Sequence, residues 1–126
     1  MEKRIGIAAL VAVLAASPAT AGTLATSAVF SGNGDDVVCM LSNVSAKPLT
    51  GVAVSVKGAT GGTPAATLSS TDCTPTLAAG ASCFLNRTLS GADRVRCEFS
   101  FAGAARRARG SMVLDDGSRV FVLDAR

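Results

Sequence analysis

The sequence contains no histidine, tryptophan or tyrosine, and phenylalanine is its only aromatic residue. Histidine is the commonest general base and metal ligand, so its absence excludes most serine and cysteine triads and ordinary zinc sites. Without tyrosine or tryptophan the chain also lacks the best side chains for stacking unpaired bases. Its net charge of +3 is too small to indicate a nucleic-acid-binding surface. We therefore expect a protein that is not an enzyme, that binds no metal or cofactor and that has no nucleic-acid partner.

Charged residues are scarce as well, at 17% of 126 residues, whereas hydrophobic residues make up 48%. This balance is typical of a folded chain and not of a disordered one. The length allows one modest domain. The sequence shows no internal repeat and, after its first residues, no helical periodicity.

The first residues have the three parts of a secretory signal peptide. A basic start is followed by an apolar run over residues 5–16 and by small residues up to Ala21. The apolar run is shorter than the roughly 20 residues that span a bilayer. We predict cleavage after Ala21, with Ala16 and Ala19 as alternatives, and no transmembrane anchor in the mature protein. The alternative interpretation is a buried helix of a cytosolic domain.

All four cysteines lie after the predicted cleavage site, at Cys39, Cys73, Cys83 and Cys97. An even number in an exported chain of this size predicts two disulfides. Zinc is the alternative, but the spacings contain no C-x-x-C pair and no histidine completes a ligand set. The sequence therefore predicts a single disulfide-bonded domain over residues 22–126, located in the periplasm or secreted.

The neighbours of the cysteines favour one of the three pairings. Cys73 and Cys83 bracket a short loop with a turn signal at Gly80, which allows a local bridge. Cys39 and Cys97 each lie inside an alternating apolar run, as do the cysteines that join the two sheets of a sandwich. We favour Cys39–Cys97 and Cys73–Cys83.

Short alternating runs rich in valine and phenylalanine, separated by Gly, Pro, Asn and Asp, predict an all-β protein. We expect a small immunoglobulin-like β-sandwich of about seven antiparallel strands, with a small β-barrel as the alternative. The expected strands cover residues 25–30, 37–43, 49–57, 66–69, 82–89, 94–101, 106–114 and 119–123.

The last three runs predict two consecutive hairpins in one sheet. A loop at residues 103–104 would pair Cys97 with Gly110, and a loop at residues 116–117 would pair Met112 with Phe121. A second sheet, containing residues 37–41 and 52–56, would face this one. The inward face of the hairpins would carry Val95, Cys97, Phe99, Phe101, Ala108, Gly110, Met112, Leu114, Phe121 and Leu123.

Three motifs follow one another along the chain: Val-Val-Cys39-Met-Leu-Ser-Asn, Leu77-Ala-Ala-Gly-Ala-Ser-Cys83 and Cys97-Glu-Phe-Ser-Phe. This pattern resembles a group of small exported proteobacterial proteins, most of them uncharacterised. Their common turn reads Leu-Ala-Pro-Gly, whereas Ala79 stands here in place of the proline. The resemblance covers residues 37–126 and implies an exported, disulfide-bonded β-sandwich. It implies no activity.

Four arginines are the candidate contact residues: Arg94, Arg96, Arg107 and Arg109. In the predicted hairpins they share the outer face of one sheet, with Glu98 opposite Arg109. Guanidinium groups suit phosphates and carboxylates, so this face is a candidate contact for an acidic envelope glycan or protein. The alternative is a solvated sheet face with one cross-strand ion pair.

The sequence thus favours an exported, non-enzymatic β-sandwich that binds a partner or belongs to the cell envelope. One alternative is a strand-exchanging subunit of a surface assembly. Another is an inhibitor that presents the disulfide-bracketed loop over residues 74–82. The acidic pairs Asp35-Asp36 and Asp115-Asp116 stand at expected turns and lack the spacing of a calcium loop.

Overall fold

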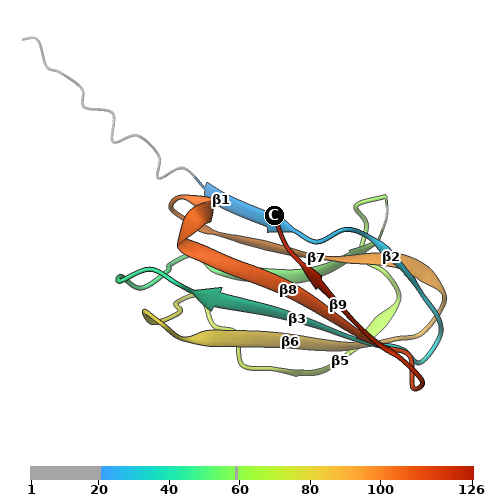
Figure 1. Cartoon of the computed structure of the whole chain (residues 1–126). Coiled ribbons are helices and arrows are strands. Elements are labelled where there is room, and N and C mark those ends of the chain that lie inside the picture. Colours follow the sequence, from blue (N-terminus) through green and yellow to red (C-terminus); the bar gives the residue numbers. More distant parts are fainter. Residues whose placement is uncertain (1–20, 59) are drawn as a thin grey trace, which may run out of the picture.

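The computed structural model describes residues 21–58 and 60–126, which form two antiparallel β-sheets packed as a sandwich (Figure 1). The prediction of an all-β sandwich is confirmed. The predicted signal peptide lies outside the described residues except for Ala21, the first residue of the first strand. In the described part of the chain, no helix has the length and apolar character needed to cross a membrane.

Nine strands and one 3-10 turn are found in the described residues, against about seven strands expected. The predicted strand over residues 25–30 is divided in two, because Thr26 leaves the regular ladder and exchanges hydrogen bonds with the backbone of Cys97. The elements are β1 (Ala21–Ala25), β2 (Val29–Ser31), β3 (Asp36–Asn43), β4 (Ala53–Gly58), β5 (Ala66–Thr71), β6 (Ser82–Leu89), β7 (Asp93–Ala102), η1 (Ala105–Arg107), β8 (Ala108–Asp115) and β9 (Val120–Asp124).

Strand β7 is the centre of the smaller sheet. β1 and β2 follow one another along one side of it, and β4 lies along the other. The larger sheet has the order β5-β6-β3-β8-β9. The alternating side chains of both sheets meet in one core, whose largest fully buried members include Phe99, Phe101, Leu41, Leu49, Leu89 and Met112.

Two disulfides hold this sandwich, with the pairing that the neighbouring residues favoured. Cys39 on β3 is bonded to Cys97 on β7, and this bond joins the two sheets through the core. Cys73, which follows β5, is bonded to Cys83 on β6 and ties neighbouring strands of the larger sheet together. One bridge therefore stabilises the packing of the sheets, and the other stabilises one side of a single sheet.

The predicted hairpin between β7 and β8 is wrong. The turn η1 carries the chain from the smaller sheet to the larger one, so Gly110 pairs with Leu41 of β3 and not with Cys97. β4 is also misplaced by the prediction, since it pairs with β7 in the smaller sheet, whereas it was expected in the same sheet as β3. Alternation identifies which side chains point inward, and those of β7 and β8 do, but it does not identify the strand's neighbours.

A glycine shows how the inward faces of β7 and β8 meet across the core. A β-carbon on Gly110 would lie 2.6 Å from Cε2 of Phe99. The ring of Phe99 therefore packs into the space that the missing side chain leaves. The two residues were predicted as members of one face, and they are instead contacts between two opposing faces.

The β8–β9 hairpin is present, but its register differs from the prediction by two residues. Phe121 lies opposite Leu114, and Leu123 lies opposite Met112. The turn lies one residue later than expected: the N–H of Asp116 donates to the carbonyl of Arg119, which leaves Gly117 and Ser118 between them, and Gly117 takes a φ of +88°. A shift of two residues keeps each side chain on its predicted face.

Candidate functional site

The four candidate arginines do not form one surface. Arg94 and Arg96 lie on the outer face of β7 in the smaller sheet, whereas Arg109 lies on β8 in the larger sheet. The outer faces of a two-sheet sandwich point in opposite directions, so these side chains are separated by the core. The predicted arginine face is therefore wrong, for the same reason as the predicted β7–β8 hairpin.

Two of these arginines already have partners within the protein. Nη2 of Arg96 lies 2.7 Å from Oε1 of Glu98 on the same strand, so the predicted pair of Glu98 with Arg109 is wrong as well. Arg107 lies in η1 and donates to the hydroxyl of Ser45 and to the carbonyls of Lys47 and Pro48. Its guanidinium holds the loop that follows β3.

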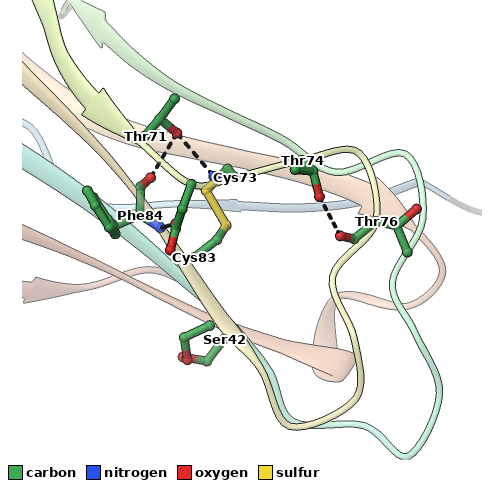
Figure 2. Close-up of a disulfide and its surroundings, with 9 residues drawn as sticks. Ser42, Thr71, Cys73, Thr74, Thr76, Cys83 and Phe84 are labelled. Carbon is green, nitrogen blue, oxygen red and sulfur yellow. Dashed lines mark hydrogen bonds between the residues drawn. A yellow bond between two sulfur atoms is a disulfide. The ribbon is translucent and has the colours of Figure 1, made fainter.

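The loop between Cys73 and Cys83 is fixed by more than its disulfide. Figure 2 shows the hydroxyl of Thr71 accepting from the N–H of Cys73 and donating to the carbonyl of Phe84, next to the bridge. Further along, Leu77 is buried and exchanges two backbone hydrogen bonds of 2.9 Å with Leu49. An inhibitory loop has to present its central side chain and backbone to an enzyme. Here Leu77 anchors the loop, whereas the residues on either side of it, 74–76 and 78–80, are exposed.

The described residues offer little metal-binding chemistry. Asp72, Cys73 and Cys83 place ligand-type atoms close together, but both sulfurs belong to a disulfide. Asp35 accepts a hydrogen bond from the N–H of Gly32, as a turn residue does. Asp116 accepts from the N–H groups of Ser118 and Arg119, which lower the pKa of its carboxyl. These carboxylates stabilise turns.

A shallow hollow of about 320 Å³ lies on the outer face of the smaller sheet. Small side chains of β1 and β4 surround it, among them Thr23, Ala53 and Ser55, and Glu98 stands at its side. The carboxylate of Glu98 is already paired with Arg96. The other polar groups of the lining are the hydroxyls of Thr23, Ser55 and Ser100 and the residue Arg126.

The most unusual surface lies on β9, at one edge of the larger sheet. Val120, Phe121 and Val122 are 62%, 42% and 64% exposed, although all three are large and apolar. Proteins commonly protect a free edge with a lysine, a proline or a bulge. β9 has none of these within Val120–Asp124, and its one charged residue, Asp124, is the last of the strand. We define the β9 edge as this strand together with its backbone groups that point away from β8.

The hydrogen bonds beside β9 show which backbone groups point outward. The N–H of Ala125 donates to Gly110, and that of Asp116 donates to Arg119. In an antiparallel ladder, residues bonded to the neighbour alternate with residues whose groups face away. The N–H and C=O groups of Val120, Val122 and Asp124 therefore face away from β8. No strand among the described residues pairs with them.

Phe121 shows that the core is open at this edge. It lies opposite the buried Leu114, on the face of the sheet that packs against the core, and yet 42% of it is exposed. Past β9, Arg126 exchanges two backbone hydrogen bonds of 3.1 Å with Ala25, and the C-terminus lies beside β1 (Figure 1). The two sheets meet at this corner and then separate.

A hollow of about 340 Å³ marks where they separate. It is lined by Ala25 and Ser27 on the side of the smaller sheet and by Val122, Leu123 and Asp124 of β9. The sandwich is thus bridged at one corner and open beyond it, which distinguishes it from the closed barrel considered as the alternative.

The sequence predicted a strand at this place but assigned Phe121 and Leu123 to a covered core. One signal of the exposed edge was present: residues 120–123 are apolar at every position, without the alternation of a half-buried strand. Such a run indicates either a strand that is buried on both faces within its own domain or a strand that is buried when a partner binds.

Comparison of the chain with known protein families, with curated proteins and with solved structures finds no match. The candidate site therefore rests on the geometry of the β9 edge.

Proposed function

We propose that this protein is an exported, non-enzymatic β-sandwich that acts by binding, and that its partner adds an extended strand to the β9 edge. The observation that carries the proposal is the combination of exposed apolar side chains with outward-facing backbone groups on β9. In strand addition, main-chain hydrogen bonds supply affinity and alternate side chains supply specificity.

The disulfides and the N-terminal sequence support export. Disulfides persist in oxidising compartments such as the periplasm and the extracellular space, and both pairs of cysteines are bonded here. The first 21 residues have the pattern of a signal peptide. Cleavage after Ala21 would leave Gly22, the second residue of β1, at the start of the mature chain.

We further propose that the sandwich is immunoglobulin-like. A disulfide that joins the two sheets through the core, here between β3 and β7, supports this description. The core tryptophan of antibody domains has no counterpart, because the chain contains none.

An acidic partner bound by arginines is the weaker candidate. Arg94 and Arg96 do share one face, and Lys57 lies opposite Arg96 in the neighbouring strand. However, Glu98 offsets part of this positive charge, and both members of the ion pair are partly exposed to solvent. Screening makes such surface charges weak determinants of affinity.

Strand addition can be tested with a synthetic peptide of alternating valine and threonine, added to the oxidised, exported protein. We expect the peptide to shift the amide NMR signals of Val120, Val122 and Asp124 and to leave those of β5 unchanged. A peptide that is N-methylated at alternate residues lacks the required donors and should not bind. Equal binding of both peptides, or shifts that avoid β9, would contradict the proposal.

Two lysine variants provide the matched comparison. Val122→Lys places a charge on the β9 edge, a device that blocks strand pairing. Ser70→Lys places the same charge on β5, at the opposite edge of the same sheet. The peptide should bind the Ser70→Lys protein as it binds the wild type and should fail to bind the Val122→Lys protein.

A further inference from the structure

We propose that the strand added to the β9 edge is β9 of a second copy of this chain, paired antiparallel about a two-fold axis at Phe121. The inference rests on the proposed function of this edge and identifies the partner. Three features of β9 support it. The outward-facing backbone groups match those of a second copy, the side chains match as well, and the segment that is free to pair is centred on Phe121.

The backbone groups match in this register. Val120 of one copy lies opposite Val122 of the other, and both residues have N–H and C=O groups that face away from β8. Residues placed opposite one another with outward-facing groups exchange both hydrogen bonds of an antiparallel pair. The two-fold axis repeats the same exchange on the other side of Phe121, as an isologous interface requires.

The side chains also match on the face that points to the core. Phe121 of each copy would lie opposite the other, at a position where the strands approach most closely because no hydrogen bond separates them. Aromatic cross-strand pairs stabilise a sheet. The pair would cover the exposed part of each ring and extend the row that begins at Leu114.

On the outer face the pairing joins apolar side chains. Val122 lies next to Val113 of β8, which in turn lies next to Val38 of β3. A second copy would place its Val120 beside Val122 and extend this valine row across the interface. Val120 and Val122, which are 62% and 64% exposed, would each lose part of that exposure to the neighbouring valine.

The ends of β9 set the limits of the pairing. At one end Arg126 is bonded to Ala25, so an added strand cannot continue past Asp124. At the other end the side chain of Asp116 accepts the N–H of Ser118, which removes that donor from any new strand. Pairing centred on Phe121 uses residues 119–123 alone and therefore avoids both obstacles.

The first test is sedimentation velocity of the oxidised, exported protein from micromolar to millimolar concentration. We expect a concentration-dependent dimer. Val122→Lys should raise its dissociation constant about tenfold or more, because the lysine would lose hydration at the interface, where it lies opposite the apolar Val120 of the other copy. Ser70→Lys is the control on β5 and should leave the dimer unchanged. Equal dimerisation of both variants would overturn the inference.

The second test locates the axis by cysteine cross-linking under mild oxidation. In Phe121→Cys, the new side chain lies directly opposite its copy, at a Cβ–Cβ distance of about 5 Å, and should form a disulfide-linked dimer. In Val122→Cys, the new side chain lies opposite Val120 and should cross-link much more slowly. A faster reaction of Val122→Cys would overturn the register.

These outcomes separate the partner from the function. If the wild type remains monomeric at millimolar concentration while the valine–threonine peptide still binds β9, the second copy is excluded as the partner and strand addition stands. If the peptide does not bind and the protein does not dimerise, both proposals fail.

Discussion

The two edges of the larger sheet, β5 and β9, are built in opposite ways. β5 is dominated by serine and threonine, and its register shifts between Leu68 and Ser70. β9 is apolar over residues 120–123 and has a regular register along its whole length. β5 is also tied to its neighbour by the Cys73–Cys83 disulfide just beyond its end, whereas β9 is attached by a turn and a bridge of two hydrogen bonds.

Side-chain hydrogen bonds to the neighbouring strand also distinguish β5 from β9. The hydroxyl of Ser69 lies 2.7 Å from that of Thr88, and the hydroxyl of Thr71 donates to the carbonyl of Phe84. Both bonds connect β5 to β6. A bulge and polar side chains are devices that keep an edge from pairing with other chains. One edge of this sheet is therefore protected, and the other has the properties of a pairing site.

The largest expected effect is a loss of stability that β5 and β9 share, so that the two edges no longer differ. Replacing Cys39 and Cys97 with alanine deletes the disulfide between the sheets, which closes a loop of 58 residues. Loop entropy predicts that the free energy of unfolding falls by about 4 kcal/mol. Urea denaturation measures this loss, and hydrogen exchange should accelerate in β5 and β9 alike. Protection that persisted in either edge would show that the edge is stable without the packed sheets.

A smaller effect should weaken β5 alone. Replacing Cys73 and Cys83 with alanine deletes a bridge that closes a loop of 10 residues, for an expected loss of about 3 kcal/mol. Because the bridge ties the end of β5 to β6, amide exchange should accelerate in β5 before it does in β9. Association through β9 should be unchanged. Loss of the dimer in this variant would show that the two edges are coupled.

The smallest effect should weaken β9 alone, through the turn that precedes it. Hydrogen bonds from the N–H groups of Ser118 and Arg119 lower the pKa of Asp116 below its usual value of 3.8. Because the folded pKa is the lower one, this contribution to stability is present above the unfolded value and is lost as pH falls through the folded one. We expect NMR to show the turn and β9 loosening at strongly acidic pH while β5 keeps its protection.

An asparagine at position 116 supplies the control for this titration. Asp116→Asn keeps an oxygen acceptor but removes the charge, so the exchange of the Ser118 and Arg119 amides should no longer respond to acid over that range. If β9 loosened with the same pH dependence in this variant, another carboxylate would be responsible.

Much of this protein follows from its sequence alone. Alternation placed Val95, Cys97 and Phe99 in the core, where they are buried, because side-chain direction in a strand depends only on position along the chain. The short loop between Cys73 and Cys83 and the apolar surroundings of Cys39 and Cys97 favoured the pairing that the structure contains. The absence of histidine limited the available chemistry before any fold was considered.

What the sequence could not determine is which strands are neighbours. Gly110 and Phe99 were expected on one sheet, but they meet across the core, because the same alternating pattern suits either arrangement. The candidate arginines were separated for that reason. The exposure of β9 was likewise decided by tertiary structure alone: β9 is an edge because none of the described strands pairs with its outer side, and that depends on the path of the chain.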